Sequence, residues 1–157
     1  MEKVPMTAGG LQALEDELRQ LKFVERQEVI KAIEVAREHG DLSENAEYHA
    51  AREKQSFIEG RVMELEGIIS YADVIDPKAL SGDVVRFGAT VELADEDTDE
   101  ESTFQIVGTH EANVEDGKLS VTSPTARALI GKEEGDSVEV RTPGGEKSYE
   151  VLKISYG

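Results

Sequence analysis

Apolar residues recur every three or four positions in the first part of the chain, which is the spacing of one face of an α-helix. They are Leu11, Leu14, Leu18 and Leu21, followed after an irregularity by Val29 or Ile30, Ile33 and Ala36. The spacing predicts a helix over residues 8–39, with Thr7 as its N-cap. The irregularity lies beyond Glu25, and the segment 22–28 contains no glycine or proline. We therefore expect a local change of helical phase there, and not the end of the helix.

A second apolar stripe follows, alternating steps of three and four residues, with Gln55 at one seam position. Its members are Tyr48, Ala51, Ile58, Val62, Leu65, Ile69 and Ala72. Such a narrow seam suits packing against a single helix. Because only a few residues near Gly40 separate the two stripes, we predict a long antiparallel coiled-coil hairpin. With about 30 residues in each arm at 1.5 Å per residue, it would be roughly 45 Å long.

The helical pattern stops after Val74, where Pro77 and Gly82 indicate a linker. We therefore predict three parts: a hairpin at residues 1–75, a linker at 76–82 and a second domain at 83–157. Strand-like runs in this domain cover residues 83–93, 103–109, 118–122, 137–142 and 147–156. A short helix is expected at 125–130. A small antiparallel sheet with one short helix makes the predicted fold class α+β.

Charge and composition limit the possible functions. The chain of 157 residues carries 17 basic and 34 acidic residues, a net charge of −17, which opposes general binding to nucleic acid or to anionic membranes. It contains no cysteine, which excludes disulfides, thiolate metal sites and cysteine nucleophiles. The N-terminus lacks the apolar run of a signal peptide, and no stretch approaches the roughly 20 apolar residues of a membrane span. We expect a cytoplasmic protein.

Two carboxylates, Asp41 and Glu44, lie where the chain passes from one predicted arm to the other. Gly40 tolerates the left-handed conformation that often ends a helix. One interpretation of the acids is a capping box, with Asp41 as N-cap and Glu44 reaching back to it. The other is that both project from the tip and bind a hard cation such as Mg²⁺. Two carboxylates are too few for a complete two-metal site, so they would complete the site of another molecule.

Two arginines lie within about two turns of this tip, one on each arm. Arg52 has no carboxylate three or four residues away on its own helix, so it is free to meet a phosphate. Arg37 can pair with Glu34 or Asp41, and a solvated ion pair is its simpler interpretation. Together the arginines could form a small positive collar in an otherwise acidic protein.

Two other possible metal sites are not supported by the sequence. Asp95, Asp97 and Asp99 imitate the first ligands of a calcium loop, but the glycine and the final glutamate of that loop are missing. A solvated acidic connection between strands is the better interpretation. The chain's three histidines lack the spacing of a zinc site.

Three stretches spread over the chain resemble the Gre-type bacterial transcript-cleavage and elongation factors, most closely the GreA branch. They are AREHGDLSENAEYHAAREK at residues 36–54, FGATVEL at 87–93 and SPTARALIGKEEGD at 123–136. The resemblance implies that the hairpin enters the secondary channel of bacterial RNA polymerase. It also implies an FKBP-like second domain that docks at the rim of the channel. The protein would then stimulate the polymerase's own cleavage of backtracked RNA without being an enzyme itself.

The resemblance also implies roles for individual residues. Asp41 and Glu44 match the acidic pair that helps hold the polymerase's second catalytic Mg²⁺, which would not be bound tightly by the factor alone. Asn45 and Tyr48 match residues that support the tip. The arginines described above, Arg37 and Arg52, match a basic patch that faces the extruded RNA 3′ end.

A further match concerns docking: Ser123 and Pro124 fall on the loop that meets the polymerase rim.

Two other functions remain open. A secondary-channel regulator would bind with the same hairpin and modulate the polymerase without cleavage. A structural coiled-coil adaptor would explain the seam but leave the acidic tip without a role. A monomer suits insertion into a channel.

Overall fold

The structure is a computed structural model that describes residues 2–40, 44–76 and 82–156. Contacts within the chain divide it into two compact units. One consists mainly of Leu11–Ala72, and the other combines Lys3–Gly10 with the chain from Asp73 onward. Most of the predicted linker, residues 77–81, lies outside the described residues, so the predicted division at 75 and 83 stays a prediction.

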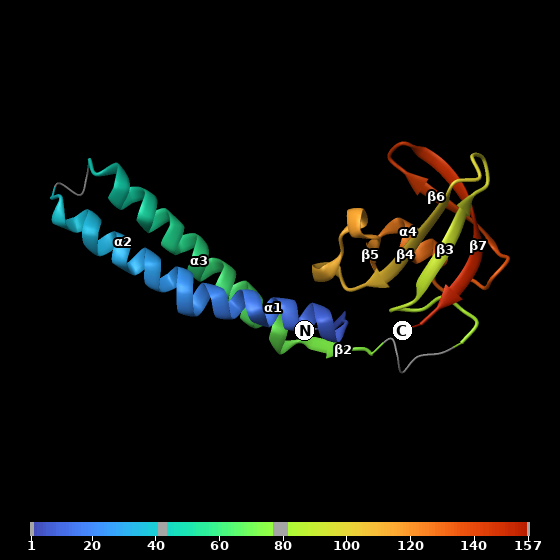
Figure 1. Ribbon diagram of the computed structural model, residues 1–157, viewed down its shortest axis with the longest axis horizontal. Coiled ribbons are helices and arrows are strands. Elements are labelled where there is room, and N and C mark those ends of the chain that lie inside the picture. Colours follow the sequence, from blue (N-terminus) through green and yellow to red (C-terminus); the bar gives the residue numbers. More distant parts are fainter. Residues whose placement is uncertain (1, 41–43, 77–81, 157) are drawn as a thin grey trace. The chain divides into compact units, whose positions relative to one another are not determined.

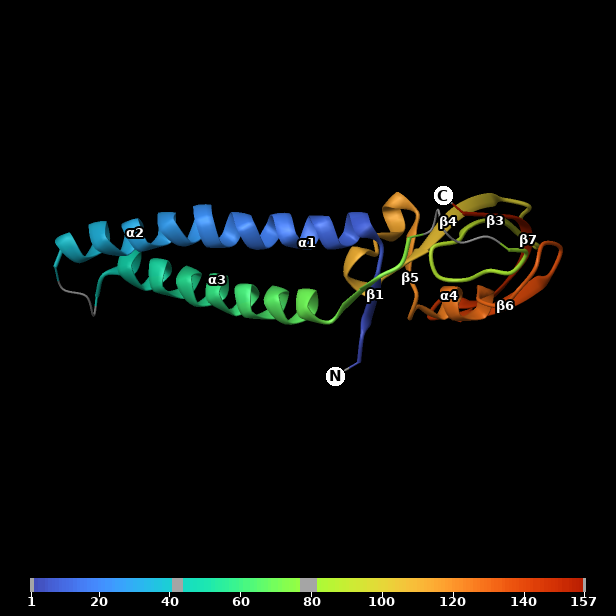
Figure 2. The same cartoon turned by 90° about the horizontal axis from the view of Figure 1, so that it is seen from below.

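The first unit is built from two helical arms that run side by side in opposite directions (Figures 1 and 2). The first arm comprises α1 (Ala8–Gln20), a π-helical turn η1 (Leu21–Glu25) and α2 (Arg26–Glu38). The second arm is α3 (Ala46–Ser70), whose 25 residues extend over about 37 Å. The predicted helical hairpin is confirmed, although α3 ends before Ala72.

The π-helical turn explains the irregular apolar spacing of the first arm. Leu21 and Val29 are both buried, with 6% and 3% of their surfaces exposed, whereas Ile30 is 39% exposed. Val29 lies eight positions after Leu21, one more than the seven positions of a heptad. A π-helical turn accommodates one extra residue and so returns the following helix to the seam. The expected change of phase is confirmed, and of the two possible seam residues the structure buries Val29.

Two bidentate ion pairs join the arms on either side of this turn. The guanidinium of Arg61 donates from Nε and Nη2 to the two carboxylate oxygens of Glu17, at 2.7 and 2.9 Å. The guanidinium of Arg26 binds Glu59 in the same way, at 2.8 and 2.6 Å. Hydrogen bonding from Arg61 holds the pKa of Glu17 below its ordinary value. Such paired bonds fix both distance and orientation between the helices.

The second unit begins with a contact that the sequence analysis did not anticipate. β1 (Val4–Met6) pairs with β2 (Ala72–Val74) in a two-stranded sheet. After β1, the hydroxyl of Thr7 accepts a hydrogen bond from the backbone N–H of Gly10, which confirms Thr7 as the N-cap of α1. The backbone N–H of Thr7 donates to the Glu111 carboxylate at 2.9 Å.

A five-stranded sheet forms the body of the second unit, with strand order β5-β4-β3-β7-β6. The strands are β3 (Thr90–Asp95), β4 (Glu101–Val107), β5 (Lys118–Ser120), β6 (Ser137–Thr142) and β7 (Gly145–Ser155). The short helix α4 (Pro124–Leu129) packs against β6 and β5. Alternation along β3 buries Val91 and Leu93 in an apolar core.

The α+β class is confirmed, with two corrections. β5 runs parallel to β4, so the sheet is mixed and not purely antiparallel as expected. The first strand of the five-stranded sheet begins at Thr90 and not at residue 83, because in the preceding segment Val84 forms an isolated bridge with Glu133 and no strand. None of the helices in the described part of the chain is long and apolar enough to cross a membrane.

Candidate functional site

The tip of the hairpin is the first candidate site, and its two ends are well defined. The first arm ends at Glu38, with His39 as C-cap and Gly40 in the left-handed region at φ 72°. The second arm begins at Ala46. Asp41 lies outside the described residues, so Glu44 is the member of the predicted acidic pair that the structure describes.

Asn45 joins the two arms at this tip. Its side-chain oxygen accepts a hydrogen bond from the backbone N–H of Tyr48 at 3.0 Å and so caps α3. Its side-chain nitrogen donates to the backbone carbonyl of Ala36 in the first arm at 2.8 Å. One half-buried amide therefore satisfies a free N–H at the start of one helix and binds a carbonyl in the last turn of the other, which also accepts from the backbone N–H of His39.

This geometry contradicts the capping-box interpretation of the two acids. Because Asn45 is the N-cap, Glu44 precedes the helix and does not occupy its first turn. Glu44 is exposed and lies at the edge of a shallow hollow with His39 and Glu47. Its carboxylate is therefore available for a cation or for another molecule.

The chemistry of this carboxylate fits a hard cation such as Mg²⁺, which prefers oxygen ligands. However, no group of three or more acidic or histidine side chains in the described segments is arranged to hold a metal ion. Ligands from the tip alone would be few, and Mg²⁺ commonly accepts one or two protein carboxylates while keeping water and substrate oxygens.

Tyr48 lies in the first turn of α3, next to the cap. Its side chain is half-buried, and its ring meets that of His49 edge to face, with centroids 5.7 Å apart. Its backbone N–H is the one that Asn45 caps. Tyr48 is thus part of the ordered start of the second arm, beside Glu44.

Arg37 and Arg52 differ from Arg26 and Arg61, which form the ion pairs between the arms. Both are exposed, and none of the salt bridges found within residues 2–40, 44–76 and 82–156 involves them. Arg26 and Arg61 are instead paired across the arms. The pairing of Arg37 with Glu34 that the sequence allowed is therefore not made, and Asp41, the other possible partner, lies outside the described residues. Both guanidinium groups are exposed to an anion from outside.

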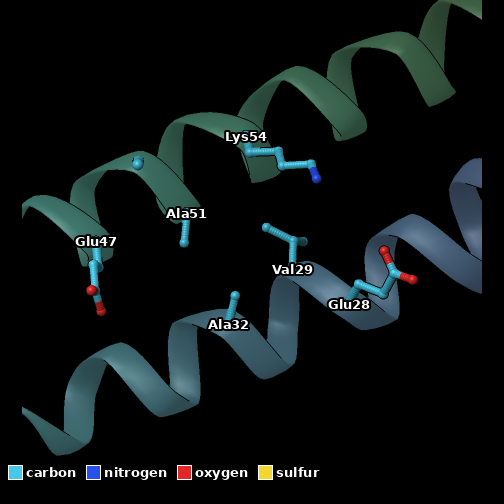
Figure 3. Close-up of a pocket in the computed structure, with 7 residues that line it drawn as sticks. Glu28, Val29, Ala32, Glu47, Ala51 and Lys54 are labelled. Atoms are coloured by element: carbon cyan, nitrogen blue, oxygen red, sulfur yellow. The ribbon is translucent and has the colours of Figure 1, made fainter.

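A hollow between α2 and α3 lies just behind the tip (Figure 3). It is lined by Glu28, Val29 and Ala32 of the first arm and by Glu47, Ala50, Ala51 and Lys54 of the second. Figure 3 shows Val29, Ala32 and Ala51 pointing into the space between the helices. The alanines add little bulk to this part of the hairpin. The sequence analysis did not single out this feature.

Ser123 and Pro124 belong to the second unit, at the start of α4. The Ser123 hydroxyl accepts a hydrogen bond from the backbone N–H of Ala126 at 3.2 Å, so Ser123 is the N-cap. Pro124 is the first residue of the helix and is exposed. Pro suits this position because its fixed φ matches a helix and its missing N–H is not needed there. The turn therefore presents two uncharged side chains, those of Ser123 and Pro124, at a capped helix start.

The acidic segment after β3 is organised as a turn. The Asp95 carboxylate accepts hydrogen bonds from the backbone N–H groups of Asp97 and Thr98, at 2.9 and 3.2 Å. These bonds explain why an aspartate stands at the start of the connection between β3 and β4. The expectation of an acidic connection between strands agrees with this geometry.

Comparison with known proteins identifies relatives over the whole length of the chain. One family model, "Transcription elongation factor, N-terminal", matches residues 4–74, and another, "Transcription elongation factor, GreA/GreB, C-term", matches residues 80–156. The transcription elongation factor GreA of Ruegeria pomeroyi is 72% identical over 156 residues, with 99% of each chain covered. GreA of Jannaschia sp. is 69% identical over the same coverage.

Among solved structures, the crystal structure of GreA factor homolog 1 of Thermus thermophilus is similar to this chain. The two are 32% identical, with 98% of this chain and 99% of the other covered, at a TM-score of 0.45.

Proposed function

This chain belongs to the GreA/GreB family of transcription elongation factors, and we propose that it performs the family's task with the tip of its helical hairpin. As a member, it is an accessory factor that stimulates transcript cleavage by RNA polymerase and is not itself an enzyme. The proposal concerns how this chain does so. The hairpin enters the secondary channel, and the tip reaches the active site of a backtracked complex in the bacterial cytoplasm.

The observation that carries the proposal is the closed tip. Asn45 ties the end of the first arm to the start of the second, and Glu44 stands exposed beside it. A carboxylate at the end of a helical rod about 37 Å long can be delivered into a channel that a compact domain could not enter. Placing it directly beside the capped start of a helix, and not on a long loop, restricts its position.

Asp41 and Glu44 would hold a Mg²⁺ ion jointly with the polymerase. In such a site the ion lowers the pKa of a bound water and offsets charge on the scissile phosphate. The chain's own contribution is to supply oxygen ligands and to orient them through Asn45 and Tyr48. Since Mg²⁺ accepts one or two protein carboxylates, the tip supplies as many as such an ion takes.

Arg37 and Arg52 would contact the extruded RNA 3′ end. Both are exposed and unpaired among the described residues, and guanidinium groups bind phosphate oxygens with good geometry. The net charge of −17 opposes binding of RNA elsewhere on the surface. Contact with RNA is thus confined to the region behind the tip.

Ser123 and Pro124 would dock the second unit on the rim of the channel. This separates two tasks: the second unit supplies affinity, and the hairpin tip supplies ligands. A monomer is sufficient, because one hairpin fills one channel.

The alternative is a channel-binding regulator that blocks or modulates the polymerase without cleavage. It would need the hairpin and the docking turn but not the carboxylates. Glu44 is exposed beside Asn45, which joins the two arms at the tip, and this arrangement favours cleavage. A purely structural adaptor would use neither the acids nor the unpaired arginines.

The test is release of a 3′-labelled RNA fragment from a backtracked bacterial polymerase complex in Mg²⁺. We would compare the native chain with the Asp41→Asn, Glu44→Gln double variant. A matched control, Glu34→Gln with Glu53→Gln, also removes two negative charges, but from exposed positions on the first and second arms.

Cleavage should be lost in the tip variant, whereas polymerase binding persists, and the control should cleave as the native chain does. Tight binding of the native chain without any cleavage would instead establish the regulator. Equal loss in both double variants would mean that charge in general, and not ligation at the tip, is responsible.

A further inference from the structure

Three hydroxyl groups from two segments meet at the base of the turn that carries Ser123 and Pro124. The oxygens of Ser120 and Thr122 are 2.8 Å apart, and that of Thr109 lies 3.2 Å from Ser120 and 3.5 Å from Thr122. Thr109 belongs to the short helix after β4, whereas Ser120 ends β5. We call these three residues the hydroxyl cluster.

The hydroxyl cluster joins Thr109, which lies in a segment with its own hydrogen bonds, to Ser120 and Thr122 of the turn. Thr109 follows the buried Gly108, whose backbone N–H donates to the Glu111 carboxylate at 2.8 Å. The backbone N–H of Glu111 donates in turn to the carbonyl of Gly108. Thr109 therefore projects from a segment that has its own hydrogen bonds and does not depend on the turn.

The turn from Ser120 to Ser123 is held by two bonds of its own and by one backbone bond to β4. The backbone N–H of Ser123 donates to the carbonyl of Ser120 at 2.9 Å, and that of Thr122 donates to the Ser120 hydroxyl at 3.2 Å. The backbone N–H of Val121 donates to the carbonyl of Val107 in β4 at 2.8 Å, and the hydroxyl of Thr109 adds a side-chain tie to the same turn from the short helix that follows β4. Its bonds restrict where the turn points.

These hydroxyls are not needed to form the core of the unit. Thr109 and Thr122 are exposed, and the apolar core is built from residues such as Val91, Leu93 and Ile106. When a surface hydroxyl loses its partner, water replaces the bond at little cost in stability. The bonds of the cluster can therefore affect the conformation of the turn without deciding whether the protein folds.

We propose that the hydroxyl cluster is a positioning device, which fixes the turn bearing Ser123 and Pro124 in its docking conformation before the polymerase binds. This inference rests on the proposed docking role of that turn. Binding costs the free energy of ordering mobile groups, so a turn that is already ordered binds more tightly. Thr109 is a positioning residue, because it acts through the turn and does not itself meet the polymerase.

The proposal separates affinity from chemistry. The cluster lies in the second unit, and the carboxylate of Glu44 lies in the first. Removing a hydroxyl from the cluster should weaken docking but leave cleavage unchanged once the polymerase is saturated. A weakening of about two- to fivefold corresponds to the net effect of one typical hydrogen bond.

The experiment measures cleavage of backtracked complexes over a range of factor concentrations. Thr109→Val keeps the shape of the side chain and removes the hydroxyl, whereas Thr109→Ser keeps the hydroxyl. Pro124→Ala tests the docking turn itself. Thermal unfolding of each variant is followed in parallel, and Tm should stay within about 2 °C of the native value for an exposed site.

We expect Thr109→Val to raise the half-saturating concentration about two- to fivefold at an unchanged maximal rate, and Thr109→Ser to restore the native value. Native behaviour of Thr109→Val beside weak docking of Pro124→Ala would overturn the positioning role and leave the docking turn intact. Equal weakening by valine and serine would also overturn it, because the hydroxyl would not be the agent. Unchanged docking of Pro124→Ala would remove the docking role and the inference together.

Discussion

Asn45 provides the sharpest link between the local structure of the tip and its proposed function. Asn45→Ala removes both of its hydrogen bonds, one to the backbone of Tyr48 and one to the carbonyl of Ala36. Asn45→Ser keeps an oxygen that can cap α3 but is too short to reach the other arm. The pair of variants therefore separates helix capping from closure of the tip.

The structure allows an estimate of both effects. Loss of an N-cap costs about 1 kcal/mol, and loss of one net hydrogen bond costs about 1 kcal/mol. Asn45→Ala should therefore lower the free energy of unfolding of the hairpin by about 2 kcal/mol, and Asn45→Ser by about 1 kcal/mol. The hairpin should remain folded, because the buried seam residues such as Ile58 and Leu65 are untouched.

Asn113→Ala is a matched control for this experiment. Asn113 also accepts a hydrogen bond from a nearby backbone N–H, that of Glu115 at 3.1 Å, but it lies in the second unit. Thermal unfolding would be followed by circular dichroism at the helical band. In the cleavage assay, Asn45→Ser should lower the maximal rate and Asn45→Ala should lower it further. The half-saturating concentration should change little for either variant.

The reasoning would be refuted by a destabilised Asn45→Ala variant that still cleaves at the native maximal rate. In that case the position of Glu44 would not depend on closure of the tip. A similar loss of cleavage in Asn113→Ala would also refute it, because stability in general would then be limiting.

Two further predictions concern the arms. Gly60 and Gly67 lie inside α3, and a Cβ added at either would meet no atom within 4 Å, so each change to Ala should stabilise the hairpin by about 0.5–1 kcal/mol in thermal unfolding. Gly40→Ala, equally open but at φ 72°, should destabilise it, and stabilisation there would contradict the argument. Because hydrogen bonding from Arg61 lowers the pKa of Glu17, the pair stabilises the hairpin above the ordinary pKa of 4.5 and loses this effect as the pH falls further. Glu17→Gln should cost roughly 0.5 kcal/mol at pH 7, since both side chains are partly exposed and screened. Urea titrations at pH 7 and in acid should show this cost shrinking as the pH falls below 4.5.

The sequence predicted those parts of the fold that depend on local periodicity. The two apolar stripes define the hairpin because a seam of buried residues repeats along each arm, and even the irregularity beyond Glu25 was visible as a break in spacing. Its form as a π-helical turn was not predictable, since a phase change can be accommodated in several ways. The pairing of β1 with β2 was missed because strands of three residues carry almost no periodic signal.

The site was predicted less completely, for a related reason. Sequence spacing placed the acids and arginines near the tip, but one of its two interpretations of the acids was a capping box, whereas Asn45 caps α3. Asp and Asn are both favoured N-caps, and only the start of α3 decides between Asp41 and Asn45. The hydroxyl cluster joins residues more than ten positions apart, which no local pattern reveals.

The two ion pairs beside the π-helical turn bear directly on the accuracy of the tip. α2 contains 13 residues, so its end lies about 20 Å beyond the turn. A bend of about 5° at the turn would move that end by about 2 Å, whereas catalytic ligands must be held within about 0.5 Å. The bidentate bonds of Arg61 to Glu17 and of Arg26 to Glu59 tie the first arm to α3 before and after the turn. Because they oppose bending at the one irregular point of the arm, these charged pairs help to set the position of Glu44 from a distance.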